Sequence, residues 1–193
     1  MVEPRRNGCV RRSRLHRVGF EKKVVCEWSR DGEFNVNALI QNLQIHRVEQ
    51  GQLERVKAIL ERCEMYITSI TLEGSCYWLA HFDGLEVGCI GLEHGTGASL
   101  IRSAAVLPEF RSSGIGRTLT LFALEQAHLR GDRAVYLFTS DMGPYWQRFG
   151  FVEVPLETLV QALPDVSQVQ SGMCMGWLEQ SRAWKKTLEP RGV

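Results

Sequence analysis

The chain has 193 residues and a formal net charge of +1, with 44% hydrophobic and 23% charged residues. This length suits one domain with a substantial core. The composition is that of an ordinary globular protein and excludes a disordered or disulfide-dense class. No apolar run approaches the length of a membrane span, so a membrane partner is not expected.

Positive charge is concentrated at the N-terminus. Residues 1–23 hold eight Arg or Lys and two Glu. The segment lacks the apolar stretch of a secretory signal. We therefore expect residues 1–40 to be a basic, disordered tail. Nucleic-acid binding is only a minor alternative, because no aromatic residues alternate with the basic ones.

Six cysteines are scattered along the chain without a Cys-x-x-Cys pair. This usage is typical of reduced thiols in the cytoplasm. The spacing contains no zinc motif, so no metal is expected.

The first half of the domain reads as strands around one helix. In chain order we expect a strand over 43–48, an amphipathic helix over 50–64, a short helix or loop over 66–75, strands over 76–82 and 85–92, and a strand over 99–107. The two middle strands flank Asp83-Gly84, which is typical of a β-hairpin turn.

The second half alternates helices and strands. We expect a helix from about 115 to 130 that ends at Gly131, a strand over 134–138, a short helix before Gly150-Phe151, a strand at 152–154, a helix over 156–163 and a last strand over 173–178. The folded domain is thus expected to span 41–180, with 181–193 as a polar extension.

The most informative stretch is 106–117, where a strand runs through a glycine-interrupted loop into a helix. The first N–H groups of a helix have no internal partner and attract anions. Gly114 and Gly116 let a phosphate approach the backbone, and Arg111 and Arg117 can add charged donors. The loop lacks the Walker A ending and the third glycine of the dinucleotide motif. A helix start without a ligand is the alternative.

This loop resembles the Arg/Gln-x-x-Gly-x-Gly/Ala loop of the GCN5-related N-acetyltransferases (GNATs), which binds the pyrophosphate of acetyl-CoA. Residues 134–154 resemble the second half of that family's core, and the whole resemblance covers about 43–179. It implies an α/β GNAT fold, with a mixed, mostly antiparallel sheet of about six to seven strands and about four helices. It also implies acetyl-CoA as co-substrate.

Within the family, the chain most resembles the acetyltransferase group associated with arsenic resistance. Gly91-Leu-Glu93 and Leu100-Ile-Arg102-Ser-Ala-Ala-Val106 carry that resemblance. The acetyltransferase domain of N-acetylglutamate synthase comes next. That synthase has an acidic residue where Leu100 stands and an Arg where Val169 stands, so this chain lacks both.

The resemblance implies a set of cofactor contacts. Backbone groups of the strand would pair with the pantetheine arm, and the N–H of Val106 would polarise the thioester carbonyl. The implied contacts are Ala104, Val106, Arg111, Ser112, Ser113, Gly114, Ile115, Gly116, Arg117 and Trp146.

The family's usual acid toward the leaving thiolate is a Tyr four residues before the Gly of the Gly-Phe pair. Trp146 stands there in this chain. Tyr145 is one residue earlier, which turns it by about 100° on a helix. Tyr145 is therefore either a repositioned acid or a packing residue, and Trp146 is expected to pack against the cofactor arm.

Five residues are candidates for the acceptor side of the reaction. Glu93 is either a base acting through water or a solvated strand end. Arg102 is either a carboxylate anchor or the partner of a structural carboxylate, since an unpaired charge in an apolar strand is costly. Ser103 lies next to it and faces the opposite side if the strand is regular. Thr139, at the end of a central strand, can bond the amine, and Ser171 can bond a substrate carboxylate or cap a turn.

The resemblance implies an N-acetyltransferase that moves acetyl from acetyl-CoA to the amine of a small molecule. The amine would be an amino acid or a similar compound, attacking directly in a ternary complex. N-acetylglutamate synthase is one alternative. A non-catalytic domain that senses acetyl-CoA is the other. A homodimer is left open.

Overall fold

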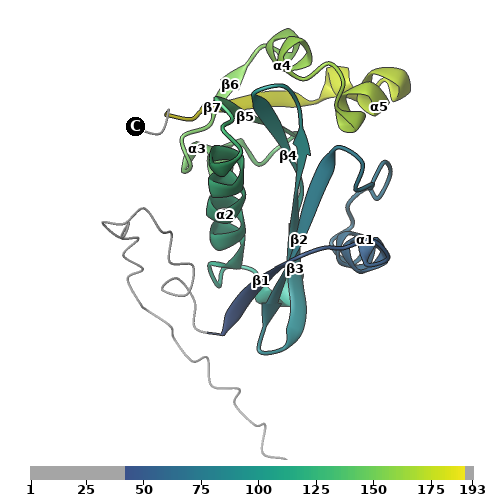
Figure 1. Cartoon of the computed structure of the whole chain (residues 1–193), viewed down its shortest axis with the longest axis vertical. Helices are drawn as coiled ribbons and strands as arrows, with labels where there is room; N and C mark the ends of the chain where they lie inside the picture. Colours follow the sequence, from purple (N-terminus) through teal and green to yellow (C-terminus); the bar gives the residue numbers. More distant parts are fainter. Residues whose placement is uncertain (1–41, 190–193) are drawn as a thin grey trace, which may run out of the picture.

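The computed structural model describes residues 42–189, and the expected basic tail over 1–40 lies outside them. Seven strands form one sheet in the order β1-β2-β3-β4-β5-β7-β6 (Figure 1). They are β1 (Leu43–Arg47), β2 (Ser75–Phe82), β3 (Leu85–His94), β4 (Ala98–Val106), β5 (Ala134–Thr139), β6 (Val152–Val154) and β7 (Arg182–Thr187). Among these strands of residues 42–189, only the β4–β5 pair is parallel.

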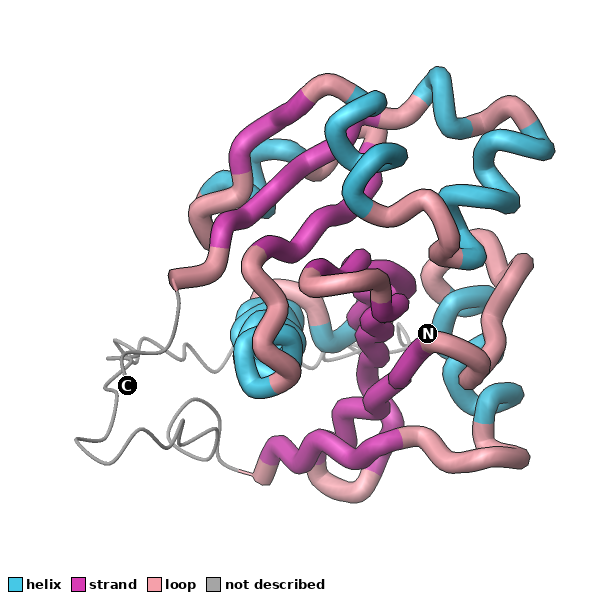
Figure 2. Tube along the Cα trace, turned by 45° about the horizontal axis from the view of Figure 1, so that its top comes forward, coloured by secondary structure: helices cyan, strands magenta, loops and turns pink. Residues whose placement is uncertain are grey.

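Helices cover both faces of the sheet. The described residues form α1 (Leu53–Arg62), α2 (Ile115–Leu129), α3 (Gly143–Gln147), α4 (Leu156–Ala162) and α5 (Ser167–Met175), with short 3-10 segments η2 (Pro108–Phe110) and η3 (Leu178–Gln180). α1 and α2 lie on opposite sides of β3 and β4 (Figure 1). Figure 2 looks nearly along the axis of α2 and shows that helix beside the strand layer.

The helices α1 and α2 bury the faces on which the sequence places their apolar residues. Val56, Ile59 and Leu60 of α1 are buried against the face of the sheet that carries Tyr77 and Leu79. On the other face, α2 buries an apolar stripe that begins at Ile115 and packs with a second core cluster. A third cluster lies between β4, β5, β7 and the α4–α5 segment. This arrangement confirms the predicted mixed α/β fold.

The predicted hairpin forms with the predicted turn. Phe82 of β2 pairs with Leu85 of β3. Asp83 and Gly84 between them have φ of 50° and 80°. Positive φ at both central residues matches the right-handed twist of the strands, which is why Asp-Gly is favoured there.

The last strand was predicted in the wrong place. Residues 173–175 close α5, and the strand is β7, inside the segment expected to be a polar extension. β7 lies between β5 and β6 and contributes Ala183 and Trp184 to the core. Its Lys185 and Lys186 are half-buried, because long stems can cover apolar surface while the ammonium reaches water.

Across residues 42–189, none of the helices is both long and apolar enough to cross a membrane.

Candidate functional site

β4 and β5 open away from each other halfway along β4. Their pairing runs from Ala98–Ala134 to Ile101–Leu137 and stops there, although β4 continues to Val106. Just past the last pair, Ser103 has a φ of 52° and the register with β3 shifts. This is a β-bulge, which bends a strand and redirects its groups. The expectation for Ser103 assumed a regular strand, and the strand is not regular there.

The bulge sends the backbone of Val106 into this opening. The N–H of Leu107 donates to the carbonyl of Val87 on β3 at 2.9 Å. Successive N–H groups of a strand point to opposite sides. The N–H of Val106 therefore points away from β3, toward the side that β5 has left. Its carbonyl accepts hydrogen bonds from Arg111 Nε at 3.1 Å and from Cys63 Sγ at 3.5 Å.

The glycine loop continues directly from this strand end. Ser112 and Gly114 have φ of 63° and 93°, so the chain turns tightly before α2. The first internal bond of α2 is from the N–H of Thr118 to the carbonyl of Gly114, at 3.0 Å. The N–H groups of residues 115–117 precede that bond and project from the helix start. With the helix dipole, they form a cradle for an anion.

The loop side chains divide between the core and the surface. Ile115 is buried in the core and can offer a ligand only its backbone N–H. Residues 111–114 are exposed, as is Arg117. A Cβ added to Gly116 would lie 3.3 Å from Tyr145 Oη and 3.6 Å from Val106 Cγ2. The loop, the end of β4 and α3 therefore meet at Gly116.

Tyr145 reaches the loop, and Trp146 does not. Trp146 is 7% exposed and packs against Phe149 and Phe151. This leaves it little surface for the cofactor contact expected of it. Tyr145 Oη lies 3.0 Å from Thr120 Oγ1. Burial raises the pKa of Tyr145 above its ordinary value, so the phenol keeps its proton at neutral pH.

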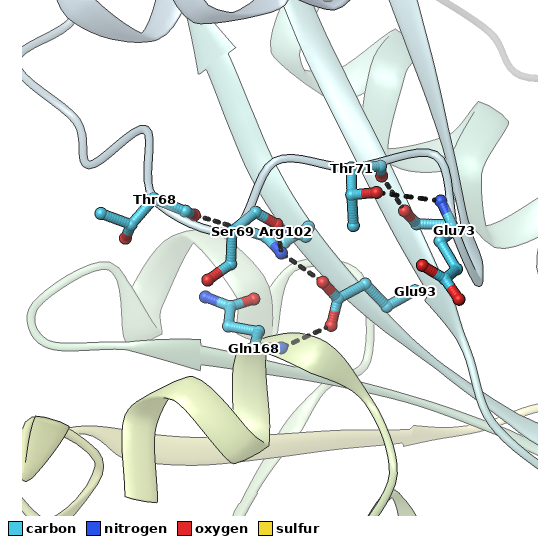
Figure 3. A network of polar contacts seen from close by, with 8 residues as sticks. Thr68, Ser69, Thr71, Glu73, Glu93, Arg102 and Gln168 are labelled. Carbon is cyan, nitrogen blue, oxygen red and sulfur yellow. Dashed lines mark hydrogen bonds and ion pairs between the residues drawn. The ribbon is translucent and has the colours of Figure 1, made fainter. Parts of the chain in front are cut away.

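Glu93 and Arg102 form a buried ion pair. Arg102 is 7% exposed and Glu93 is 2% exposed. The other carboxylate oxygen of Glu93 accepts the N–H of Gln168 at 2.9 Å (Figure 3). The solvated strand end expected as one alternative for Glu93 is wrong, because β3 runs on to His94 and the start of α5 covers it. Arg102 has the structural carboxylate that one sequence alternative proposed.

The remaining acceptor candidates lie on two different elements. Thr139 ends β5, and its Oγ1 accepts the N–H of Met142 at 3.1 Å. Ser171 is on α5 rather than on a strand, with Oγ 3.6 Å from Met175 Sδ. Two cavities lie beside α1 instead, and neither includes Thr139 or Ser171. One, of about 330 Å³, is lined by β1 and β2, and the other, of about 530 Å³, by the β2–β3 turn and η2.

Sequence reasoning missed three groups that hold the site together. Thr120 holds Tyr145, and the carbonyls of Thr68 and Ser69 hold Arg102. Backbone carbonyls of an irregular segment leave no signal in the sequence. Thr120 lies one helical turn after Gly116, so its position on the same face of the helix could have suggested that it lies near the loop.

A family model described as an acetyltransferase (GNAT) domain matches residues 73–153. Two curated proteins are also similar. The probable N-acetyltransferase camello of Xenopus tropicalis is 31% identical over 94 residues, or 45% of this chain and 43% of that protein. An uncharacterized N-acetyltransferase of Chlorobaculum tepidum is 33% identical over 88 residues, or 45% of this chain and 56% of that protein. The chain spans about half the length of these relatives.

One solved structure is N-acetylglutamate synthase from Neisseria gonorrhoeae, complexed with coenzyme A and N-acetyl-glutamate. It superposes with a TM-score of 0.61 at 18% identity, over 76% of this chain and 35% of that one. At this identity the likeness shows the fold alone. The family match and the curated relatives support an acyltransferase. The resemblance to the arsenic-resistance group stays a prediction.

Proposed function

We propose that this chain, whose residues 73–153 match an acetyltransferase (GNAT) domain model, moves the acetyl group of acetyl-CoA to the amine of a small molecule. The acceptor would be an amino acid or a similar compound. The observation that carries the proposal is the continuity of the β4 opening with the N–H cradle at the start of α2. One elongated ligand with a phosphate-bearing end fits that path.

The proposed cofactor contacts are mostly backbone groups. N–H groups of residues 112–117 would bind the pyrophosphate, and the exposed side chains of Arg111 and Arg117 would add charge. The pantetheine arm would pair with the backbone of Ala104 and Val106, as a strand pairs with its neighbour. Gly116 has no side chain that could fill the space beside Tyr145 and Val106.

The chemistry would be direct attack by the amine on the thioester. The N–H of Val106 points into the opening and would stabilise the oxyanion that develops on the carbonyl. Thr139, at the end of β5, would accept a hydrogen bond from the amine. Both carboxylate oxygens of Glu93 have partners inside the protein, which argues against this residue as the base. The amine proton would pass to solvent.

Tyr145 has two candidate roles, as the acid toward the leaving thiolate or as a packing residue. The phenol is protonated at neutral pH, as an acid must be, but burial raises its pKa and so weakens it as a proton donor. In addition, Thr120 has one hydroxyl hydrogen, and it is donated to the carbonyl of Gly116 at 2.9 Å. Tyr145 must then donate its own proton to Thr120. We therefore favour packing.

Two alternatives to this function stay open. The first is N-acetylglutamate synthase, an example of which shares the fold. Leu100 and Val169 are both fully buried, which is unsuited to the polar residues that stand there in the synthase. A non-catalytic acetyl-CoA sensor is favoured if the proton of Tyr145 is held in its hydrogen bond to Thr120 and is not available to a leaving thiolate.

A cytoplasmic location belongs to the proposal and is supported by the free thiols of the described cysteines.

The test is release of free CoA from acetyl-CoA with a panel of amino acids, their amides and simple amines. The proposal expects turnover with carboxylate-bearing or amino-acid-like amines. Turnover confined to glutamate would select the synthase. Tight acetyl-CoA binding without turnover on any amine would select the sensor.

A further inference from the structure

Arg102 occupies the point where β4 leaves β5. It directly follows the last β4–β5 pair, Ile101–Leu137, and precedes the bulge at Ser103. Both terminal nitrogens of its guanidinium bond groups of the protein, whereas its Nε is buried without a partner. Nη1 donates to the carbonyl of Ser69 at 3.0 Å and also to Glu93, while Nη2 donates to the carbonyl of Thr68 at 3.1 Å (Figure 3).

Glu93 extends this contact to a third segment. One oxygen pairs with Arg102, and the other accepts the N–H of Gln168, the second residue of α5. Two irregular or short segments are thereby tied to the sheet through one ion pair. The first is the loop over 66–74, and the second is the start of α5. They are about a hundred residues apart in the sequence and share no strand or helix.

The bonding pattern requires these particular side chains. Carbonyls inside an irregular segment need donors, because no ladder supplies them. A guanidinium offers several N–H groups in a fixed plane and can serve two successive carbonyls and a carboxylate together, whereas an ammonium cannot match that geometry. The carboxylate can in turn accept Arg102 with one oxygen and the α5 backbone with the other.

We propose that Arg102 and Glu93 are positioning residues that hold the 66–74 loop and the start of α5 beside the β4–β5 opening and so set the shape of the acceptor site. Neither touches the acceptor. The part of the proposal that concerns the acceptor rests on the function proposed above, whereas the coupling of the two segments does not.

Hydrogen–deuterium exchange on the full chain tests the coupling. Glu93→Gln should speed exchange in the 66–74 loop, which contacts Arg102 and not Glu93. Arg102→Lys should speed exchange at the start of α5, which contacts Glu93 and not Arg102. We expect each crossed effect to be about tenfold. If each variant changes only the segment that its own side chain contacts, the pair is not a coupling device.

An exposed pair of the same chemistry supplies the control. Arg62 donates to Glu109 at 2.5 Å, with side chains 57% and 49% exposed. Arg62→Lys and Glu109→Gln should leave exchange in both segments unchanged. If a single variant at the buried pair fails to fold, the double variant Arg102→Met/Glu93→Gln leaves no unpaired buried charge. It should fold and exchange faster in both segments. Wild-type exchange in this double variant would overturn the proposal.

Steady-state kinetics separates positioning from direct contact. In Arg102→Lys, the acceptor KM should rise about tenfold for every acceptor alike, while acetyl-CoA affinity changes less than about threefold. A rise in KM confined to carboxylate-bearing acceptors would show that Arg102 binds the acceptor, and would overturn the proposal. If the wild type acetylates no amine, the proposed function fails, and the exchange experiment still decides the coupling.

Discussion

Tyr145 is the residue whose proposed packing role rests on its hydrogen bonds. Thr120 gives its hydrogen to Gly116, so Tyr145 donates to Thr120 and its proton is engaged inside the protein. Its ring also packs on Trp146 and Phe149, with centroids 5.1 Å away in each case. These contacts describe a side chain that holds α3 against α2.

We predict that Tyr145→Phe keeps turnover within several-fold and lowers the free energy of unfolding by about 1 kcal/mol, the usual contribution of one hydrogen bond. Turnover and denaturant melts measure the two effects. Tyr66→Phe is a matched control, since Tyr66 is 92% exposed. A loss of turnover of about 100-fold or more, with unchanged acetyl-CoA affinity, would instead identify Tyr145 as the acid.

His94 gives the protein a predictable sensitivity to acid. Its Nδ1 lies 3.4 Å from Ser99 Oγ, which donates to buried Asp132, and its Nε2 lies 3.4 Å from Cys76 Sγ. Burial lowers the pKa of His94 below 6.5, and the positive charges of Arg130 and Arg47 lower it further against the opposing effect of Asp132. The unfolded chain therefore takes up a proton more readily than the folded one.

This contribution to stability is complete above pH 6.5 and is lost as pH falls through the lowered pKa of the folded state. We predict that His94→Gln makes the fall in melting temperature between pH 7 and pH 5 shallower. His128→Gln, which lies outside this network, should leave the slope unchanged. An unchanged slope in His94→Gln would show that other groups govern the acid sensitivity.

The strand β7 contributes more to the stability of the core than its polar composition suggests. Trp184 is 3% exposed and packs so closely on α3 that a Cβ at Gly143 would lie 2.5 Å from its ring. We predict that Trp184→Ala destabilises the protein by about 3–5 kcal/mol, measured by denaturant unfolding. Arg182→Ala on the same strand, at an exposed position, is the control. Equal stability of Trp184→Ala and wild type would mean that β7 is not part of the core.

The elements that the sequence predicted well share a local signature. The β2–β3 hairpin has its Asp-Gly turn, and α2 has a glycine loop before it and Gly131 after it. β7 has no such signature. Two lysines follow its two apolar residues, and Lys185 lies over the ring of Tyr136, 5.8 Å from the centroid. Because these lysines give β7 a polar composition, its sequence alone did not indicate a strand of the central sheet.

At the scale of the whole molecule, the anion cradle and the acceptor side differ in how far they could be predicted. The cradle is built from consecutive residues, 111–117, so its sequence alone indicated it. The Arg102–Glu93 pair forms hydrogen bonds with the backbone of Thr68, Ser69 and Gln168. These residues come from segments that are far apart in the sequence. Pairings over such sequence distances follow from topology, and one sequence leaves their partners open.

In the proposed complex, acetyl-CoA binds along the path from the β4 opening to the start of α2. Gly116→Asp places a carboxylate at the cradle, where it would repel phosphate. An acidic residue in the first turn of a helix is otherwise favourable, so folding should be retained. Gly116→Ala adds only a Cβ, 3.3 Å from Tyr145 Oη, and is the uncharged control.

The decisive measurement is isothermal titration of acetyl-CoA into the wild type and these two variants, with melting curves to confirm folding. We predict that the wild type binds, that Gly116→Ala binds with a modest loss, and that Gly116→Asp loses about 100-fold or more in affinity, because like charges placed side by side at an interface are costly. Wild-type protein that does not bind acetyl-CoA, or folded Gly116→Asp that binds as tightly as Gly116→Ala, would show that acetyl-CoA does not bind at this loop.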